Sequence, residues 1–594
     1  MEIANPIIDV ISDNRKGLRL YNQYLNSDIK KRKYIKDYPT VYIHNWENSD
    51  KYEVYVGETN DFFQRTMQHF DNENKRDKWQ KNIREKDASL YVIAHPEFNK
   101  SLTLDVENRL IHYLSSSNSV VKIHNARGNP QNSYYPCEDF DSIFSKIWKT
   151  LRKYNEELFL SESEIKDSAI YKASPLHKLN PEQSLAKEKI IEKISECLLK
   201  DANNQLVFVQ GDAGTGKTVL MSSIFYELIN KFEHIIDGYE NVFRNLECAI
   251  VVNHSEQLTV YEEIVKKLDL SQNEKKIVYN PTTLINLFKN KKNSPKKRDK
   301  LFDVIFVDEA HLLLTQNNQS FTDGNQLNEL IKYAKVVVVM FDKKQILNSE
   351  QYKDSKLINS YINKAESNDS YIELKTQMRM MGNKEVITWI NTFKDEGKIE
   401  NLSKDRGKYD IKIFDSPLEL ENAIKNKAND KKTKLSRIVA TYDWPYSAAS
   451  TPKDDKYWNV IIGDWKRPWN REIIRHGSKD EHKEIKGLAW AEQPKTINEI
   501  GSTYTIQGFD LNYAGVIIGP SVKYRNGKII YDMSSSCNKK ATNKRTLDDG
   551  SKISFGEEFI KNELGVLLTR GVNGLYIYAC DDELRNELKK KINL

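Results

Sequence analysis

The chain has 594 residues, 39% of them hydrophobic and 30% charged, a composition typical of a folded, soluble protein and not of a disordered or fibrous one. This length accommodates about three or four domains, and a net charge of +6 is too small for charge alone to identify a nucleic-acid-binding protein. The five cysteines form no C-x-x-C pair, which indicates a reducing compartment and no structural zinc. The N-terminus lacks the pattern of a signal peptide and no apolar run approaches the ~18 residues of a membrane span, so we expect a cytoplasmic protein.

A hairpin followed by a helix is predicted near the N-terminus. Residues 41–43 and 53–57 read as two short strands on either side of a polar turn. Residues 60–70 read as a helix, for which the capping candidates are Asn60 and Thr59. Its expected buried stripe consists of Phe63, Met67 and Phe70.

Three polar residues of this region are candidates for chemistry. Arg65 and His69 lie four residues apart on the predicted helix, so we expect them to share a face that points away from the buried stripe. Glu107 lies on a second predicted helix, at the edge of an apolar face. Such an acid is usually a solvated flank, and a pair of tyrosines on a hairpin is usually part of a core.

Together these residues resemble the GIY-YIG nuclease domain, over roughly residues 38–130. Tyr55-Val56-Gly57 matches the second signature of that family, whereas Thr40-Val41-Tyr42 keeps only the tyrosine of the first. The resemblance implies Mg²⁺-dependent cleavage of a phosphodiester, with Tyr42 or Tyr55 activating water and His69 assisting. It further implies a metal-binding role for Glu107, neutralisation of developing charge by Arg65, and a family asparagine at Asn125 or at Asn129.

A polar stretch separates this region from the rest of the chain. Between about Tyr154 and Asn180 the sequence is rich in serine and glutamate, as in Ser161-Glu162-Ser163-Glu164. Such a stretch favours a linker. We therefore predict an N-terminal domain over residues 1–153 and a linker over residues 154–178.

The next feature is a phosphate-binding loop. An apolar run at residues 206–209 leads into it, and a helix-compatible run begins at Val219. Between them, small residues let backbone N–H groups turn toward phosphates, Lys217 reaches the β and γ oxygens, and the Thr218 hydroxyl suits Mg²⁺. The pattern predicts binding of ATP with Mg²⁺ by the loop Gly211-Asp212-Ala213-Gly214-Thr215-Gly216-Lys217-Thr218.

A second acidic motif supports hydrolysis of the bound nucleotide. The run 303–307 reads as a buried parallel strand, and Asp308-Glu309-Ala310-His311 follows it directly. Carboxylates at the carboxyl end of such a strand lie where open α/β sheets bind their ligands. We expect Asp308 to hold the metal through water and Glu309 to orient and deprotonate the attacking water.

Alternation of strands and helices predicts two parallel sheets. Strand candidates at 249–253, 304–308 and 336–341 belong to a first domain over residues 179–368. A second domain over residues 369–594 carries strand candidates at residues 437–440, 515–518 and 575–578. The predicted fold is therefore α/β, with two RecA-like parallel-sheet ATPase domains after a small α+β domain.

Two insertions interrupt the second domain, near residues 443–493 and 523–558. The first contains five of the nine tryptophans, namely Trp444, Trp458, Trp465, Trp469 and Trp490. Exposed tryptophans stack on nucleic-acid bases. We favour instead a small core within the insertion.

The order of motifs from residue 175 to the C-terminus resembles superfamily 1 helicases, and specifically a bacterial helicase-domain family related to the Schlafen helicase-like group. The resemblance implies that Gln183 reads adenine, that Asn253-His254-Ser255-Glu256-Gln257-Leu258 lines the nucleic-acid path, and that Gln345 acts at the nucleotide. Phe341 stands where the family's G-D-x-x-Q motif has glycine. The remaining matches are Gln377-Met378-Arg379, Leu567-Leu568-Thr569-Arg570, and Thr503 to Asp510, which includes Gln507 and Gly508.

The two arginine motifs matter because each domain needs the other. A γ-phosphate bound on the first sheet requires positive charge from the second, and Arg379 and Arg570 are placed in the sequence to supply it. Opening and closing of the two domains then couples hydrolysis to movement along a strand.

The sequence therefore predicts a helicase or translocase fused to a GIY-YIG endonuclease. Its expected partner is nucleic acid, with DNA favoured over RNA, and the resemblance allows a homo-oligomer or a partner protein of a defence system, with no membrane. Such fusions imply bacterial restriction or antiphage defence. Two alternatives remain open: an ATP-gated binding switch with an inactive nuclease domain, and a DNA-repair motor whose nuclease nicks single strands.

Overall fold

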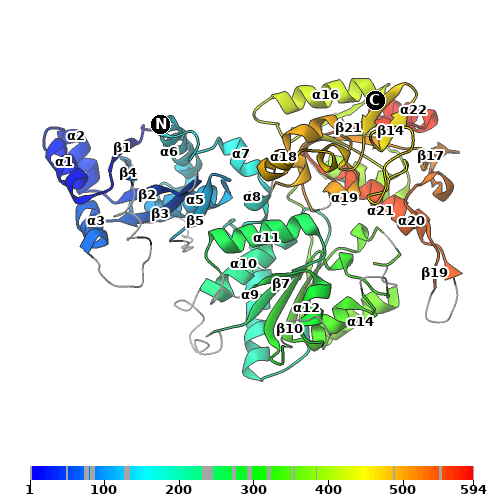
Figure 1. Cartoon of the computed structure of the whole chain (residues 1–594), viewed down its shortest axis with the longest axis horizontal. Helices are drawn as coiled ribbons and strands as arrows, with labels where there is room; N and C mark the ends of the chain where they lie inside the picture. Colours follow the sequence, from blue (N-terminus) through cyan, green and yellow to red (C-terminus); the bar gives the residue numbers. More distant parts are fainter. Residues whose placement is uncertain are drawn as a thin grey trace. The chain divides into compact units, whose positions relative to one another are not determined.

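A computed structural model of the chain describes residues 3–48, 51–71, 79, 87–125, 134–230, 245–270, 276–289, 298–317, 321–322, 324–347, 349–351, 355–382, 384–403, 405–485, 488–506, 508–546 and 552–592. The chain divides into two compact units, Met1–Lys178 with Val260–Lys276, and Leu179–Thr259 with Ile277–Leu594. Figure 1 shows them coloured along the sequence. Among the described helices, none has the combination of length and apolarity that a membrane span requires.

A five-stranded sheet forms the centre of the N-terminal unit. Its strand order is β1-β4-β2-β3-β5. The bounds are Ile7–Ser12 for β1, Thr40–Asn48 for β2, Lys51–Thr59 for β3, Ala88–Ala94 for β4 and Val120–Ile123 for β5. Strands β2 and β3 form the predicted antiparallel hairpin, in which Tyr42 lies opposite Gly57.

The helix after this hairpin differs from its prediction in cap and orientation. Helix α3 spans Phe62–Asp71, and the Asp61 carboxylate accepts the Gln64 N–H at 2.9 Å, so Asp61 and not Asn60 or Thr59 caps it. His69 is only 6% exposed, whereas Arg65 is exposed. The prediction that both face away from the core is wrong for His69, because the inward face follows the spacing Phe62, Thr66, His69 and Phe70.

Residues 154–178, predicted as a linker, instead complete the N-terminal core. They include helices α7, Glu162–Asp167, and α8, Ala169–Ala173. Leu158, Phe159 and Ile165 are fully buried against residues of the sheet and of helices α5, Lys100–Ser116, and α6, Phe140–Tyr154. The serine and glutamate run belongs to a capping box, in which Ser161 and Glu164 bond to each other's backbone.

The second unit begins with a six-stranded parallel sheet. Its order is β11-β6-β10-β9-β7-β8. The bounds are Gln205–Gly211 for β6, Cys248–Val252 for β7, Val278–Tyr279 for β8, Phe302–Asp308 for β9, Ala334–Phe341 for β10 and Tyr371–Leu374 for β11. The strands predicted at 206–209, 249–253, 304–308 and 336–341 are therefore present, with differences of a residue or two at their ends.

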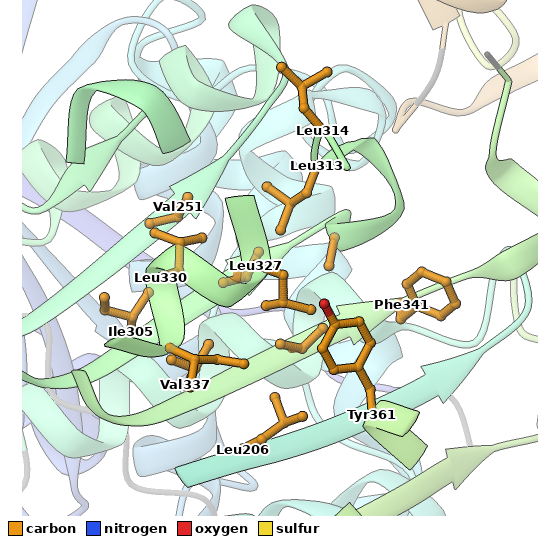
Figure 2. Close-up of a cluster of buried hydrophobic side chains, with 14 of the residues drawn as sticks. Leu206, Val251, Ile305, Leu313, Leu314, Leu327, Leu330, Val337, Phe341 and Tyr361 are labelled. Atoms are coloured by element: carbon orange, nitrogen blue, oxygen red, sulfur yellow. The ribbon is translucent and has the colours of Figure 1, made fainter. Parts of the chain in front are cut away.

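Helices cover both faces of this sheet. Figure 2 shows the core on one face, where Leu206, Ile305 and Val337 of the strands lie near side chains of helices α13, Gln326–Lys332, and α14, Ser355–Ser367. Helix α12, Pro281–Leu287, contributes Leu284 and Ile285 to the same cluster. Helices α9, Pro181–Leu199, and α10, Lys217–Asn230, pack on the strands from the other side. A sheet buried on both faces explains its uninterrupted apolar strands.

The first sheet extends beyond its predicted end. Strand β11 pairs in parallel with β6, with Tyr371 beside Phe208 and Leu374 beside Gly211. The predicted boundary at residue 368 is therefore too early. A strand that follows a helix pairs with any free edge its connection reaches, and the sequence does not specify which sheet supplies that edge.

A four-stranded parallel sheet forms the second domain of this unit. Its order is β12-β21-β16-β13, over Asp410–Ile413, Gly571–Ala579, Leu511–Ile518 and Arg437–Ala440. The three predicted strands lie within β13, β16 and β21. Helices α16, Pro417–Asn429, α21, Gly556–Leu568, and α22, Asp582–Ile592, pack on it.

The tryptophans of the first insertion are core residues, but they do not form the separate small core that the sequence favours. Trp444, Trp465 and Trp469 pack with Ile438 and Tyr576 of the sheet, and Trp458 lies against the same cluster. Trp490 is fully buried, and its indole N–H donates to Glu499 at 2.8 Å. The insertion, which includes β14, Asn459–Ile462, and β15, Trp465–Pro468, thus extends the core of the sheet and does not form a separate one.

The structure explains why Phe341 can stand where the family's G-D-x-x-Q motif has glycine. It is the last residue of β10, is 1% exposed and packs against Phe208 with ring centroids 5.3 Å apart. The backbone there is ordinary strand, so a side chain is accommodated and Asp342 starts the turn.

Replacing Phe341 with glycine should lower the free energy of unfolding by about 3–5 kcal/mol, as loss of a buried aromatic does. A urea denaturation midpoint equal to that of the wild type would contradict this packing role.

Candidate nucleotide and nuclease sites

The phosphate-binding loop connects β6 to helix α10. Gly214 and Gly216 adopt φ values of +85° and +78°, in the left-handed region that glycine tolerates. Space is a second constraint, because a Cβ on Gly214 would lie 2.8 Å from the Cβ of Arg379 and one on Gly216 would lie 2.1 Å from Nε2 of Gln183. The loop is therefore packed against residues that the sequence separates from it widely.

Lys217 and Thr218 start helix α10 beneath this loop. The Lys217 ammonium donates to the carbonyl oxygens of Gly211 and Asp212, at 2.7 and 3.0 Å, and lies 3.5 Å from Oδ2 of Asp342. The Thr218 hydroxyl donates to Oδ2 of Asp308 at 3.0 Å. A buried cation beside backbone N–H groups suits a polyphosphate, and a hydroxyl beside a carboxylate is the oxygen set that Mg²⁺ prefers, so the residues fit ATP with Mg²⁺.

Glu309 follows Asp308 in a strained backbone conformation. Its φ of +47° is left-handed, which is rare for a residue other than glycine, and its N–H donates to Oδ1 of Asp308 at 3.0 Å. Burial acts to raise the pKa of Glu309, but electrostatic interactions with His311, Lys217 and Arg570 outweigh it and hold that pKa below its usual value. The carboxylate is thus ionised, as a group that accepts a proton from water must be.

A line of contacts joins the phosphate loop to the second domain. The Gln345 amide donates to Oδ2 of Asp342 at 2.7 Å, and Nη2 of Arg570 donates to Oε1 of Gln345 at 3.0 Å. Arg570 is fully buried, and burial together with the nearby Arg379 lowers its pKa to about 10. A guanidinium buried this deeply favours the approach of an anion.

Arg379 reaches the loop from the other arginine motif. Its Nε lies 2.5 Å from Oδ1 of Asp510, and the neighbouring Met378 N–H donates to the Gly214 carbonyl at 2.9 Å. Arg379 therefore lies against the phosphate loop, whereas Arg570 is joined to it through Gln345 and Asp342. Asp510 belongs to the same motif as Gly508, so the two motifs of the second domain meet here.

Gln183 and Gly508 are the remaining predicted nucleotide residues that the structure describes. The Gln183 amide donates to the Thr215 carbonyl at 3.2 Å and is 1% exposed. Gly508 has a φ of +85°, and a Cβ there would lie 2.4 Å from Nε2 of Gln257. Gln507 lies outside the described residues.

Gln257 and Asp342 were not assigned a role at the nucleotide site from the sequence. The Gln257 amide lies 3.4 Å from Oε1 of Glu309 and also packs on Gly508, so it contacts the proposed water-activating residue and the second domain together. The adjacent Glu256 pairs with Arg471 and accepts the Trp490 N–H at 3.3 Å. The motifs that contain Gln257 and Asp342 are recognisable in the sequence. The contacts of these two residues depend on the tertiary structure, which the motifs do not specify.

The N-terminal site is built around the hairpin. The Tyr42 hydroxyl lies 3.0 Å from Nε2 of His69, and Tyr55 stacks beside Tyr42 with ring centroids 6.3 Å apart. A Cβ on Gly57 would lie 2.5 Å from the Tyr42 hydroxyl, which explains the glycine of the second signature. Thr40, where the first signature has glycine, is a buried strand residue whose backbone needs no positive φ.

Charges around these tyrosines come from two further elements. Burial, followed by Tyr55, raises the pKa of Tyr42, while Arg65 acts to lower it. Tyr42 therefore stays protonated, and its hydroxyl donates to Nε2 of His69 in the tautomer that leaves this nitrogen without a proton. The Asn125 amide donates to Oε1 of Glu107 at 3.2 Å and to the Val56 carbonyl at 2.9 Å, which places Glu107 beside the hairpin. Asn129, the alternative asparagine, lies outside the described residues.

Comparison with known proteins identifies two families. The family model described as "Schlafen group 3, DNA/RNA helicase domain" matches residues 204–581, and the model of the GIY-YIG catalytic domain matches residues 38–125. The uncharacterized protein YPL245W of Saccharomyces cerevisiae is 33% identical over 445 residues, 69% of this chain and 90% of that protein. These matches confirm the predicted resemblances to the Schlafen helicase-like group and to the GIY-YIG domain, while the bacterial label stays a prediction.

Two solved helicase structures are similar to the chain. Pif1 helicase from Candida albicans shares 11% identity over 69% of this chain and 97% of its own, with a TM-score of 0.26. A Pif1 structure concerned with unwinding at forked double-stranded DNA shares 12% identity over 67% of this chain and 92% of its own, also with a TM-score of 0.26.

Proposed function

Because the chain belongs to the Schlafen group 3 DNA/RNA helicase family and also carries a GIY-YIG domain, we propose that it is an ATP-dependent nucleic-acid translocase joined to a metal-dependent endonuclease. The observation that carries this proposal is the line of contacts from Lys217 through Asp342 and Gln345 to Arg570. It joins the phosphate loop of one domain to an arginine of the other, as nucleotide hydrolysis between two domains requires.

The residues of the loop support binding of ATP. Lys217 would hold the β- and γ-phosphates, and Thr218 with Asp308 would hold Mg²⁺, which supplies positive charge to the transferring phosphoryl group. Lys217 donates to the Gly211 carbonyl and Thr218 donates to Asp308. Phosphate oxygens would replace the carbonyl as partner of Lys217, and the metal would be bound by the Thr218 and Asp308 oxygens. Gln183 is proposed to read the adenine, as the family resemblance implies.

Hydrolysis is assigned to three charged side chains. Glu309 would orient the attacking water and take its proton. Arg379 and Arg570 would stabilise the negative charge that develops on the γ-phosphoryl group. Gln345 would couple the nucleotide site to Arg570, since its amide hydrogen-bonds to both Asp342 and Arg570.

Cleavage is assigned to the N-terminal site. Tyr42 would accept the proton of the attacking water while its own proton passes to His69, along the hydrogen bond already present. Glu107, oriented by Asn125, would hold one divalent cation, and Arg65 would neutralise charge on the phosphodiester. That these residues lie together favours an active nuclease over a docking domain.

The substrate and setting are proposed on the family resemblance. DNA is favoured over RNA, and the setting is bacterial restriction or antiphage defence, in which expression of the chain should reduce plaque formation. If a chain that hydrolyses ATP does not reduce plaque formation, the DNA-repair alternative is favoured.

Lys217→Ala tests the motor. We expect nucleic-acid-stimulated ATP hydrolysis to fall by about 100-fold or more, because a charge that stabilises the transferring phosphoryl group is lost. The measurement is phosphate release with and without single-stranded DNA, and Lys187→Ala serves as control, since Lys187 forms a partly buried ion pair that joins α9 to Glu227 of α10. A wild-type chain whose rate does not respond to nucleic acid would favour the ATP-gated switch.

A further inference from the structure

A buried acid–imidazole pair adjoins the nuclease tyrosines. Asp13 directly follows strand β1, and its Oδ2 lies 2.7 Å from Nδ1 of His44 on β2. Both side chains are fully shielded from solvent. Strand β1 pairs antiparallel with β4 and lies outside residues 38–125, the part matched by the GIY-YIG family model, so Asp13 is an addition to that domain.

The pair is costly as a purely structural feature. Removing two ionisable groups from water carries a penalty that apolar residues of similar volume would avoid. The pair also leaves Oδ1 of Asp13 and Nε2 of His44 without a hydrogen-bond partner among the described residues. Each such buried atom adds to the cost, which calls for a role other than packing.

The position of His44 indicates that role. It lies two residues after Tyr42 on the same strand, so both side chains project from one face of the sheet. The His44 ring lies edge-on to Tyr42 and to His69, with centroids 5.4 and 5.5 Å away and interplanar angles of 83° and 85°. Its other ring neighbours are Tyr55 at 5.9 Å and Trp79 at 5.5 Å. His44 therefore contacts both partners of the Tyr42–His69 hydrogen bond.

We propose that Asp13 and His44 are positioning residues of the nuclease: Asp13 fixes the tautomer and orientation of His44, and His44 holds the His69 ring where its Nε2 accepts the Tyr42 proton. This inference rests on the proposed nuclease function and adds to it a carboxylate from outside the family domain. Outer partners of this kind typically change rates by about 10- to 100-fold when removed from a histidine.

The electrostatics of the pocket agree with this arrangement. Burial, then His44 and Arg65, lower the pKa of His69 to about 3, so His69 stays neutral and its Nε2 can accept a hydrogen bond from Tyr42. The groups that face His44 are Asp13, Tyr42, Tyr55 and His69. Replacing His44 by glutamine removes one cause of the lowered pKa, so the pKa of His69 rises. Since cleavage needs neutral His69, the acid limb of the pH–rate profile then moves to higher pH.

The test uses the full-length chain and a labelled DNA duplex with Mg²⁺, under single-turnover conditions at saturating protein. Asp13→Asn and His44→Gln should each lower the cleavage rate by about 10- to 100-fold with little change in DNA affinity. His44→Gln should also shift the acid limb upward. The double variant should lose no more than the worse single one, because the two residues act as a pair. Asp9→Asn is the matched control, as Asp9 lies on β1 but bonds to Tyr21 and Lys31.

ATPase activity and melting temperature are measured on the same preparations to separate a folding defect from a loss of catalysis. Variants that match the wild type in both are counted as folded. If a single variant does not match, Asp13→Glu replaces it and should show a reduced cleavage rate with the pH profile retained. Folded variants that cleave at the wild-type rate, or whose losses simply add, overturn the pairing. Glu107→Gln separates this inference from the proposed nuclease function. If cleavage survives Glu107→Gln, the nuclease assignment itself is wrong. If cleavage is lost with Glu107→Gln but retained with Asp13→Asn, only the role of Asp13 and His44 is wrong.

Discussion

Replacing Arg570 with alanine is expected to reduce nucleic-acid-stimulated ATP hydrolysis by about 10³-fold or more, the effect of removing an arginine that stabilises a transferring phosphoryl group. The guanidinium is fully buried at the end of the contact line from Lys217, Asp342 and Gln345. In that environment a positive charge acts strongly on the γ-phosphate. ATP affinity should change far less than the rate, because the charge it stabilises develops only during hydrolysis.

The control must account for the structural role of Arg570. Its side chain also donates to the carbonyl oxygens of Phe509 and Val566, so truncation affects stability as well. Arg437 is a matched control, since it is also buried, its pKa is likewise lowered to about 10 by burial, and it bonds to Thr496 away from the phosphate loop. Arg437→Ala should lose stability without a comparable loss of rate per folded molecule. Equal rates for Arg570→Ala and the wild type would refute the shared nucleotide site.

Replacing Glu107 with glutamine is expected to reduce DNA cleavage by about 10³-fold, because the proposed divalent cation, which would supply several kcal/mol of transition-state stabilisation, would lose its carboxylate ligand. Glutamine keeps the shape and an oxygen that can still accept from Asn125. The loss should therefore follow from charge and not from misfolding. Nicking of supercoiled plasmid over a titration of Mg²⁺ measures it, and ATP hydrolysis by the same protein should be unchanged.

A second acid on the same helix provides the comparison. Asp105 lies two residues before Glu107 and accepts the Tyr134 hydroxyl at 2.7 Å. Asp105→Asn removes the same charge from α5 without touching the proposed metal ligand, so its cleavage rate should stay near that of the wild type. Equal cleavage by Glu107→Gln and Asp105→Asn would show that the nuclease metal is not held at Glu107.

Burial explains where interpretation of single residues from the sequence succeeded and where it failed. Parallel strands buried on both faces appear as continuous apolar runs, so β6, β9 and β10 were found to within a residue or two. The prediction for His69 fails because a one-residue shift of the helical stripe changes which side chains point inward. The polar run at Ser161 was interpreted as a linker, although the buried Leu158, Phe159 and Ile165 lie close to it in the sequence.

The sequence alone determined what depends on neighbours in the chain: the phosphate loop, the acidic end of β9, the hairpin with its tyrosines and the families to which these motifs belong. Backbone geometry and residue spacing set these features within a few residues. Only the tertiary structure decided that Arg570 meets Gln345, that Gln257 lies between Glu309 and Gly508, that β11 joins the first sheet and that Asp13 reaches His44. These contacts join residues far apart in the chain, and they follow from the packing of whole sheets and helices, which no local pattern encodes.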